Sequence, residues 1–455
     1  MNRPLCAATA TNPGRLGHHF SPVSVAVLTV VLAVLFLPAA SQEKKHPAPG
    51  TMIIPSSSFA NAEDLGVKAH TNVRLIVPPV AGPSELPPYL GYGYETPASL
   101  ACIYRLVTPI KGCNPNLTTN KPSGGSQSIA IVDAFDDPNA ASDLAYFSAQ
   151  FGLPFHTEKF KVIYAQGTQP PGVDPTGGWE LEEALDIEYA HAMAPEATIY
   201  LVEARDNSFG NLFGAILIAA NLVRCGNASP CPSDASGKGE VSMSWGGGEF
   251  SIEADFDWVF TAKNVVYLAG AGDAPGPIYP SASPNVISVG GTSTARSLAT
   301  GNLIQEIAWS DAGGGLSFYE LAPPYQSGIA MIAQGFRALP DVSADANPNT
   351  GYWEYDTFPL AGFSDSPKWL IVGGTSASTP LWAGILNAAS TASGHFAAST
   401  QEELTMMYSE NYAQGGSSLG FQDITYGACN YYSSSFSGQG YDLCTGLGSP
   451  NGKMK

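Results

Sequence analysis

The stretch VGGTSASTPLWAGIL, residues 372–386, carries the most informative local pattern in the chain. A strand-like run from Leu370 to Val372 meets two glycines, and the residues Thr-Ser-Ala-Ser-Thr-Pro follow. Pro380 suits the first turn of a helix, and the apolar residues after it predict a buried helix. The turn would hold Ser376 at or near the N-terminus of that helix, as a nucleophile. A serine hydroxyl needs a base to take its proton, so the rest of the sequence must supply one.

Outward from this stretch, predicted strands and helices alternate along the chain. Continuous apolar strands separated by helices predict an α/β fold, with a mostly parallel central sheet and helices on both faces. In such a sheet the active residues lie at the C-terminal ends of the strands, where most of the Gly-rich loops fall here. The expected strands are 128–135, 197–204, 241–247, 265–273 and 285–291, and the expected helices are 139–152, 181–194, 209–223 and 255–264.

The content of charged residues indicates which kinds of molecule the protein can bind. Only 13% of the 455 residues are charged, about half the usual share, and the formal net charge is -19. Nucleic acid is excluded as a partner because phosphate binding needs clustered Lys and Arg. A chain with few lysines and many carboxylates suits an acidic medium, where positive self-repulsion stays small.

The first part of the chain has the features of a signal for export. Residues 1–41 are expected to be a signal peptide, since Arg3 and Arg15 precede an apolar run that ends in small residues. That run covers residues 23–40, so an uncleaved membrane anchor is the alternative. We therefore expect a secreted protein, extracellular or periplasmic. Residues 42–95, rich in Pro, Ser and Gly, are expected to be a short propeptide or an extended N-terminal arm, and 96–455 the main domain.

Cysteine usage agrees with export. Cys6 falls in the predicted signal peptide, and the other six cysteines lie in close pairs. Six cysteines allow 15 connectivities, and proximity in sequence favours three local bridges. These are Cys102 with Cys113, Cys225 with Cys231, and Cys429 with Cys444.

Histidine is the usual base for a serine nucleophile, but the pattern does not favour it here. None of the seven histidines sits in a Gly-flanked turn at a strand end. A His-dependent serine hydrolase remains an alternative, and it predicts a histidine close to Ser376.

A carboxylate pair is the better candidate for the base. Glu182 and Asp186 lie four residues apart, so they share one face of the helix predicted over 181–194. A buried pair of this kind shares a proton, which raises one pKa and lets the pair act as acid and base in mildly acidic medium. The alternative is a solvated acidic face, because Glu180, Glu183 and Glu188 lie on the same helix.

A third carboxylate stands at the end of a predicted strand. Asp273 closes the run YLAGAGD, whose glycines allow close approach of the backbone. A protonated aspartate there would donate a hydrogen bond to a developing oxyanion, as an amide side chain does. The alternative is an ordinary turn aspartate.

By these motifs the chain resembles the sedolisin family, the serine-carboxyl peptidases with a subtilisin-like fold. The resemblance covers about residues 96–450 and rests on several separate motifs in the expected order. It implies that Ser376 is the nucleophile and Glu182 the general base and acid. It further implies that Asp186 is the orienting carboxylate and Asp273 the oxyanion stabiliser.

The resemblance also suggests residues that hold the substrate. The segment SMSWGGGE, 242–249, is similar to the strand that pairs with the substrate backbone, and AWSDAGGGLS, 308–317, to a second Gly-rich wall. Asp133, together with Trp245, is expected to extend the proton network to Glu182. The implied substrate-binding residues are Ser244, Trp245, Gly246 and Gly247.

A C-terminal motif resembles the family's calcium site, which binds one Ca²⁺ through two carboxylates and backbone carbonyls. A hard cation wants six or more oxygens, and glycines let carbonyl groups converge on it. The alternative is a Gly-rich turn held by the Cys429–Cys444 bridge. The implied ligands are Asp423, Ile424, Gly438, Gly440 and Asp442.

Together these patterns predict a secreted, acid-acting serine-carboxyl endopeptidase that hydrolyses protein or peptide substrates. We expect a monomer without a stable membrane partner. The alternatives are a tripeptidyl-type aminopeptidase and a catalytically inactive secreted scaffold of the same fold. Two features depart from the family: residues 42–95 are much shorter than its usual folded propeptide, and no acidic residue lies between Asp273 and Tyr279. Substrate preference therefore does not transfer from other members.

Overall fold

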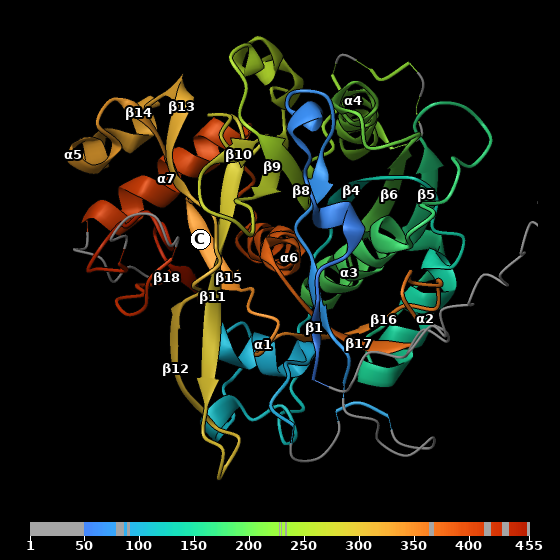
Figure 1. Cartoon of the computed structure of the whole chain (residues 1–455), viewed down its shortest axis with the longest axis vertical. Helices are drawn as coiled ribbons and strands as arrows, with labels where there is room; N and C mark the ends of the chain where they lie inside the picture. Colours follow the sequence, from blue (N-terminus) through green and yellow to red (C-terminus); the bar gives the residue numbers. More distant parts are fainter. Residues whose placement is uncertain are drawn as a thin grey trace, which may run out of the picture. The chain divides into compact units, whose positions relative to one another are not determined.

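A central sheet of eight strands runs through the molecule in this computed structural model (Figure 1). Its order is β12-β11-β9-β7-β4-β6-β5, with β15 paired to β11. Every pairing is parallel except that of β12, which lies antiparallel at one edge. The predicted mostly parallel α/β sheet is confirmed. The strands are β4 Ser128–Ala134, β5 Phe160–Tyr164, β6 Thr198–Ala204, β7 Gly239–Met243, β9 Val265–Gly270, β11 Ile287–Arg296, β12 Leu303–Ala308 and β15 Val342–Asp345.

The chain divides into residues 1–43 and 44–455, and all the residues that the structure describes belong to the second unit. The predicted signal peptide therefore lies outside the described residues. The structure describes residues 50–78, 86–88, 92–226, 228, 230–232, 234–363, 368–413, 420–429 and 436–452.

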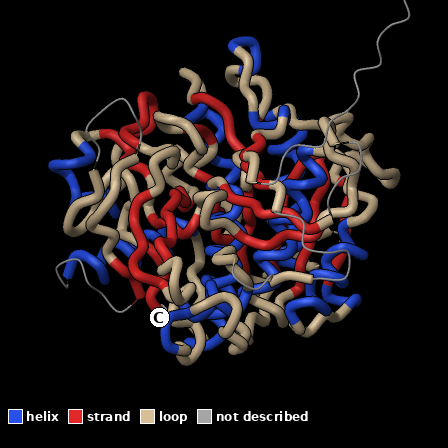
Figure 2. The backbone as a smooth tube through the Cα atoms, turned by 60° about the horizontal axis from the view of Figure 1, so that its bottom comes forward, coloured by secondary structure: helices blue, strands red, loops and turns tan. Residues whose placement is uncertain are grey.

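Helices cover both faces of the central sheet, as Figure 2 shows. Successive residues of β4 point to opposite faces: Ile129 and Ile131 join the core that contains α3 and α6, while Ala130 and Val132 join the core that contains α4. Both faces are apolar, so each strand reads as a continuous apolar run. The helices are α1 Pro97–Ile103, α2 Ala140–Phe151, α3 Gly178–Met193, α4 Phe209–Cys225, α5 Ala330–Ala333, α6 Thr375–Ser393 and α7 Thr400–Ala413.

One predicted element differs in type. The segment expected as a helix over 255–264 forms a 3₁₀ helix, η5 Glu253–Phe260. The Glu253 carboxylate accepts a hydrogen bond from the Phe250 N–H at 2.7 Å, which fixes the start of the segment two residues early. Asn264 has a left-handed φ of 64° and starts the turn into β9. The local sequence indicated a helix, but contacts with the preceding loop set where the helix begins.

Residues 50–78 contribute strands to two smaller sheets. One sheet has the order β1-β3-β17-β16, and the other has the order β10-β8-β2. Two further antiparallel pairs, β13 with β14 and β18 with β19, lie outside these sheets. The bounds are β1 Met52–Ile53, β2 His70–Thr71, β3 Arg74–Ile76, β8 Trp245–Gly248, β10 Ile278–Tyr279, β13 Gly315–Leu321, β14 Phe336–Leu339, β16 Tyr352–Tyr355, β17 Trp369–Gly373, β18 Gly420–Gln422 and β19 Ser449–Asn451.

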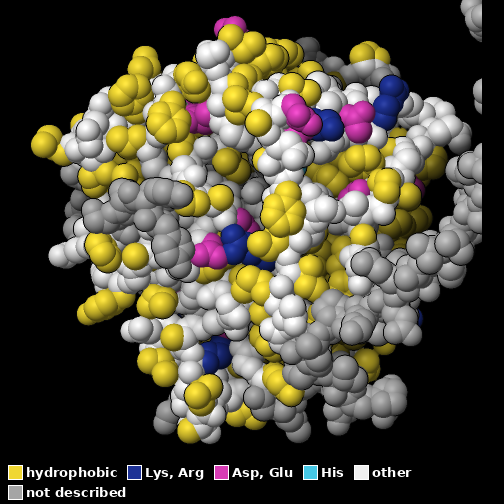
Figure 3. Space-filling model, viewed as in Figure 1, with side chains coloured by type: hydrophobic (Ala, Val, Ile, Leu, Met, Phe, Trp, Pro, Cys, Tyr) yellow, Lys and Arg dark blue, Asp and Glu magenta, His cyan; other side chains and the backbone are white. Residues whose placement is uncertain are grey.

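Covalent links and surface composition agree with the expectations from sequence. The three local disulfides form as predicted, Cys102–Cys113, Cys225–Cys231 and Cys429–Cys444. Charged side chains are sparse on the face shown in Figure 3, where uncharged polar and apolar groups dominate. Within the described ranges, none of the helices combines the length and the apolar character needed to cross a membrane.

The helices α3 and α6, which carry most of the predicted catalytic residues, pack closely against each other. Gly384 of α6 lies against the last turns of α3. A Cβ atom at this position would come within 2.7 Å of both the Ala190 carbonyl oxygen and the Met193 Cβ. The helix backbones therefore approach more closely than any other residue at 384 would allow.

We expect Gly384→Ala to lower the free energy of unfolding by about 1–3 kcal/mol, because the added methyl group overpacks this contact. Equilibrium urea denaturation followed by circular dichroism measures the change. Gly210→Ala is the matched control, since Gly210 is an exposed residue of α4 with no atom within 4 Å of an added Cβ. That control should gain about 0.4–1 kcal/mol from reduced chain entropy. A Gly384→Ala protein as stable as the control would contradict the close approach.

Candidate active site

Ser376 stands in the first turn of α6, where the chain leaves β17 through Gly374. Gly374 has a φ of +100°, which glycine adopts without strain, and it is followed directly by the helix. The Ser376 hydroxyl donates to the Ser244 carbonyl at 2.9 Å, and the residue is buried. The predicted strand-turn-helix presentation of this serine is therefore present.

Pro380 lies deeper in α6 than expected, because the helix already begins at Thr375. A proline inside a helix has no N–H to donate to the carbonyl four residues back, here that of Ser376. That carbonyl instead accepts from the Ser244 hydroxyl at 3.3 Å. The proline thus frees an acceptor that ties α6 to the end of β7.

Glu182 and Asp186 are both fully buried on α3, and so is every other residue of that helix. The alternative of a solvated acidic face is therefore wrong. Burial, and then the charge of Asp186 beside it, raise the pKa of Glu182, while the Ser376 side chain lowers it. Burial and the charge of Asp133 raise the pKa of Asp186, whose Oδ1 accepts from the Ser244 hydroxyl at 2.7 Å.

Asp133 ends β4 beside this pair, and burial raises its pKa to about 8. It acts electrostatically on Glu182 and Asp186. Trp245, expected to share in this network, donates its indole N–H to the Val132 carbonyl at 2.6 Å. The tryptophan therefore bonds to the backbone next to Asp133 and holds β8 against β4.

Asp273 follows β9 and faces the start of α6. Its Oδ1 accepts from the Thr375 N–H at 2.8 Å and from the Thr375 hydroxyl at 3.0 Å. Its Oδ2 lies 3.6 Å from Arg74 Nε and accepts no hydrogen bond from any described residue. Burial raises the pKa of Asp273 to about 7, against the opposing effects of Arg74 and Thr375. Below that pH the carboxyl is neutral and has a proton to donate.

A residue that sequence reasoning missed lies directly on the serine. Asn72 donates its backbone N–H to the Ser376 Oγ at 3.1 Å, and its carbonyl accepts from the Ser376 N–H at 3.2 Å. The same carbonyl and the Asp273 Oδ2 are the atoms that a Cβ on Gly374 would strike, at 1.9 and 2.6 Å. A peptide carbonyl therefore lies between the helix N-terminus and Asp273. No local pattern around residue 72 signals this, because the contact spans some three hundred residues.

The predicted substrate-binding residues are Ser244, which contacts Ser376, and the three residues that follow it in the chain. Ser244 lies between β7 and β8, and its carbonyl accepts from the Ser376 hydroxyl. Trp245, Gly246 and Gly247 belong to β8. One edge of β8 pairs antiparallel with β10 and the other with β2, in the register His70 to Gly246 and Thr71 to Trp245.

No described histidine is recorded as a hydrogen-bond partner of Ser376. His70 lies two residues before Asn72, but its ring nitrogens face the Ser57 carbonyl at 3.3 Å and Asp64 at 3.2 Å. His191 is buried and burial lowers its pKa to about 4. Carboxylates, not imidazoles, surround the serine in the described part of the chain.

The expected calcium ligands fall in two stretches of the chain, 423–424 and 438–442. Asp423 Oδ2 accepts from the Gly440 N–H at 2.9 Å, and Asp442 Oδ2 accepts from the Gly438 N–H at 3.0 Å. Burial raises the pKa of Asp423, and it raises that of Asp442 to about 6. Within the described ranges, no three His, Cys, Asp or Glu side chains gather in one place. Two carboxylates and flexible glycine carbonyls are hard oxygen donors and fit a calcium ion in kind.

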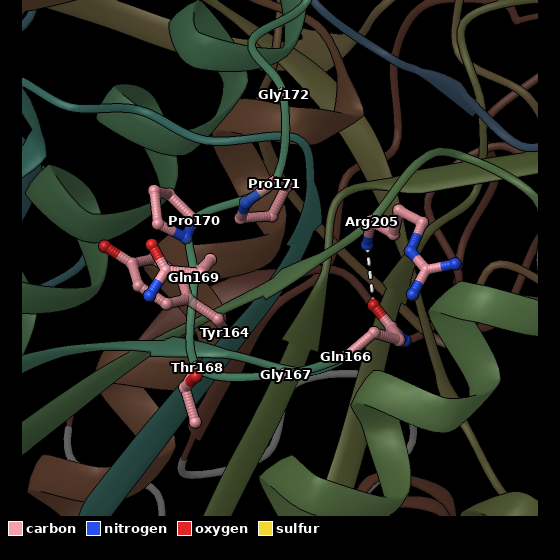
Figure 4. A pocket seen from close by; sticks show the side chains of 9 residues that line it. All are labelled: Tyr164, Gln166, Gly167, Thr168, Gln169, Pro170, Pro171, Gly172 and Arg205. Carbon is pink, nitrogen blue, oxygen red and sulfur yellow. Dashed lines mark hydrogen bonds between the residues drawn. The ribbon is translucent and has the colours of Figure 1, made fainter.

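A separate pocket of about 370 Å³ lies at the C-terminal ends of β5 and β6 (Figure 4). The Gln166 side-chain oxygen accepts from the Arg205 N–H at 2.7 Å and closes one side of it. None of the predicted site residues lines this pocket. Its lining is Tyr164, Gln166, Gly167, Thr168, Gln169, Pro170, Pro171, Gly172 and Arg205.

Comparison with solved structures identifies the class of fold. The chain superposes on Pseudomonas sedolisin, a serine-carboxyl proteinase solved in complex with two molecules of pseudo-iodotyrostatin, with a TM-score of 0.60. The match covers 78% of this chain and 95% of that one at 24% sequence identity. The fold is therefore the subtilisin-like α/β fold, as predicted.

Sequence comparison then shows which peptidases the chain is similar to. The chain is 30% identical over 361 residues to kumamolisin of Bacillus sp. (strain MN-32), which covers 72% of this chain and 59% of that protein. It is 25% identical over 372 residues to sedolisin of Pseudomonas sp. (strain 101), covering 74% and 60%. It is 27% identical over 380 residues to tripeptidyl-peptidase 1 of Macaca fascicularis, covering 74% and 61%. No family profile matches the chain. The chain is therefore similar to peptidases of the sedolisin family, and it spans about 60% of the length of these relatives.

The buried carboxylates predict how stability depends on pH. Their pKa values are raised in the folded state, so the stability that they contribute is complete below about pH 4, where the unfolded chain is also protonated. It is lost as the pH rises through the folded pKa values, such as about 8 for Asp133 and about 7 for Asp273. We expect a larger free energy of unfolding at about pH 4 than at about pH 8.

Urea denaturation at both pH values, in a Ser376→Ala background, measures this difference. Glu182→Gln should flatten the pH dependence, because the amide does not titrate. Glu63→Gln is the matched control on an exposed glutamate and should leave the slope unchanged. A protein that is more stable at the higher pH would contradict the prediction.

Proposed function

We propose that the chain is a secreted serine-carboxyl endopeptidase that works in acidic medium on protein or peptide substrates. The observation that carries this proposal is the peptide carbonyl of Asn72, which accepts from the Ser376 N–H beside the half-buried Asp273. A peptide bond with this arrangement of donors is positioned as a substrate would be. The similarity to sedolisin and kumamolisin supports the same reaction class.

In the proposed reaction Ser376 Oγ attacks the carbonyl carbon of the bound peptide. Glu182 takes the hydroxyl proton and later gives it to the leaving amine. Asp186 is the orienting carboxylate, since it accepts from Ser244, which also bonds to the backbone of Ser376. Because burial raises both carboxyl pKa values, the pair is expected to hold a shared proton, so that one member is acid and the other base.

Asp273 would stabilise the oxyanion. Its pKa of about 7 keeps it protonated in acidic medium, so that it donates a hydrogen bond where a carboxylate would repel the developing charge. The backbone N–H of Ser376, at the positive end of α6, would supply a second donor. A histidine base would be protonated under the same conditions and could not accept a proton.

An endopeptidase is favoured over a tripeptidyl-type aminopeptidase by the course of the chain at the serine. The polypeptide continues in both directions from Asn72, and on the upstream side Val67 still bonds to the Phe209 N–H at 2.9 Å. A cleft that takes more than three residues before the reacting bond suits internal cleavage. The length of the fragments released from a long peptide distinguishes the two reactions.

Ser376→Ala and Glu182→Gln are each expected to lower kcat/KM on a peptide substrate by at least about 10³-fold, because nucleophile and base act as a unit. Asp273→Ala should cost about 10²–10³-fold in kcat, whereas Asp273→Asn, which keeps a donor, should cost less. Activity against a mixed peptide library across pH, read by mass spectrometry, measures these effects. Full activity of the Ser376→Ala protein would reject the function, and so would hydrolysis confined to neutral and alkaline pH.

A calcium ion is part of the proposal as a structural cofactor. Asp423 and Asp442, with the backbone carbonyls of Ile424, Gly438 and Gly440, are the proposed ligands. A bound divalent cation would favour the ionised carboxylates, which burial alone disfavours here.

We expect removal of calcium by a chelator to lower the melting temperature and readdition to restore it, as ligand linkage requires. The effect should fade below about pH 6, where Asp442 takes up a proton that competes with the cation. Asp442→Asn in the Ser376→Ala background should abolish the response to calcium in a thermal melt. An identical response in wild type and Asp442→Asn would rule out this site.

A further inference from the structure

A buried histidine lies on the helix that carries the proposed catalytic carboxylates. His191 stands in the last turn of α3, five residues after Asp186, and only 4% of it is exposed. Its ring lies edge-on to the Phe155 ring, with 6.0 Å between the two centroids. The side chain is therefore enclosed by packing, on the same helix that holds Glu182 and Asp186.

The contacts of this ring suit a neutral imidazole. One ring nitrogen bonds to the Pro154 carbonyl, and the other, Nε2, is buried and has no hydrogen-bond partner among the described residues. A neutral imidazole carries one N–H, whereas the imidazolium carries two. Protonation would therefore place a charge and an unmatched donor in the interior. In agreement, burial lowers the pKa of His191 to about 4.

A small cavity of about 10 Å³ adjoins the ring, and two other basic side chains face it. His156 and Lys159 line it from the short helix before β5, η4 Thr157–Lys159, and from the residue that precedes this helix. The side chain that α2 contributes to the wall, Leu144, is apolar. The full lining is Leu144, Phe155, His156, Lys159, Phe160, His191, Pro195, Ala197 and Ile199.

The carboxylates around this cavity are engaged elsewhere or exposed. Glu196, in the turn after α3, has its Oε2 2.6 Å from Lys159 Nζ and 3.6 Å from His156 Nε2. Glu158 lies 3.9 Å from His156 Nδ1 and is exposed. Glu188, three residues before the histidine on α3, accepts a backbone N–H at 3.2 Å. A charged ring would thus join two basic side chains that already share one carboxylate.

The turn that holds this ring on one side holds α6 on another. Gly384 of α6 packs against the Ala190 carbonyl and the Met193 side chain, which are one residue before and two residues after His191. A disturbance of this last turn therefore reaches the contact between α3 and α6 directly.

We propose that His191 is an acid switch, whose protonation loosens the last turn of α3 and the contact of that turn with α6. This inference does not rest on the proposed function, because it concerns the stability of the fold. The unfolded chain takes up the proton near pH 6.5, but the folded chain takes it up only near pH 4. The stability that the neutral ring contributes is complete above about pH 6.5, and it is lost as the pH falls through about 4.

This loss runs against the effect of the buried carboxylates, which stabilise the folded chain as the pH falls. The free energy of unfolding should therefore pass through a maximum in mildly acidic medium and decline below it. The decline is the part that the histidine controls.

The test compares the full-length Ser376→Ala protein, the parent, with the same protein carrying His191→Asn. The asparagine amide keeps a donor for the Pro154 carbonyl and does not titrate. Urea denaturation at about pH 6.5 and about pH 3.5 measures both proteins. We expect the unfolding constant of the parent, relative to that of the variant, to rise by about 10²-fold between the two pH values.

His395→Asn is the matched control at an exposed histidine, and it should follow the parent at both pH values. If His191→Asn does not fold at about pH 6.5, His191→Phe takes its place, because phenylalanine keeps the volume of the ring. An equal pH dependence in the parent and the His191 variant would overturn the proposal. A control that removes the pH dependence would overturn it too.

Hydrogen–deuterium exchange of the parent alone locates the change. Peptides from residues 187–197 are compared with peptides from α4, which packs on the other face of the sheet and corrects for the intrinsic effect of pH. We expect exchange at 187–197, relative to α4, to accelerate as the pH falls through about 4. A ratio that stays constant from about pH 6.5 to about pH 3 would reject the switch, whatever the outcome for peptide hydrolysis.

Discussion

The close contact between α3 and α6 is the constraint on which the site depends. α3 carries Glu182 and Asp186, and α6 carries Ser376, so the distance between these helices decides whether the proposed acid and the proposed nucleophile meet. Gly384 allows the backbones to approach, and Ser244 bonds to both Asp186 and the Ser376 carbonyl. Burial in this contact also raises the carboxyl pKa values, so one packing arrangement supplies both geometry and proton affinity.

Much of the fold and the motif residues could be predicted from sequence, because the signals were local. Buried parallel strands read as apolar runs, and a four-residue spacing places two carboxylates on one helix face. The carboxylates gave no sign of being buried, since α3 as a whole is rich in acidic residues. Only the tertiary contacts that enclose the helix decide between a solvated face and a shared proton.

Other parts depend on contacts that no local pattern records. Asn72 and Arg74 reach the site through pairing with strands far along the chain, β8 and β17. Pro380 indicated the start of a helix, but the helix begins five residues earlier because Ser244 satisfies the carbonyl that the proline leaves free. The short segment around 255 formed a 3₁₀ helix for a similar reason, since Glu253 bonds back to the preceding loop. The roles of the motif residues and the calcium ligands stay predictions.

The position of β3 has a consequence for synthesis on the ribosome. β3 lies between β1 and β17, so an N-terminal strand cannot complete its sheet until residues 369–373 exist. Contacts of such long sequence separation form slowly, and the unpaired segment stays exposed in the meantime. Ser376, the proposed nucleophile, is made directly after that strand. The last strand that fixes the N-terminal segment and the serine that the segment covers therefore emerge from the ribosome together.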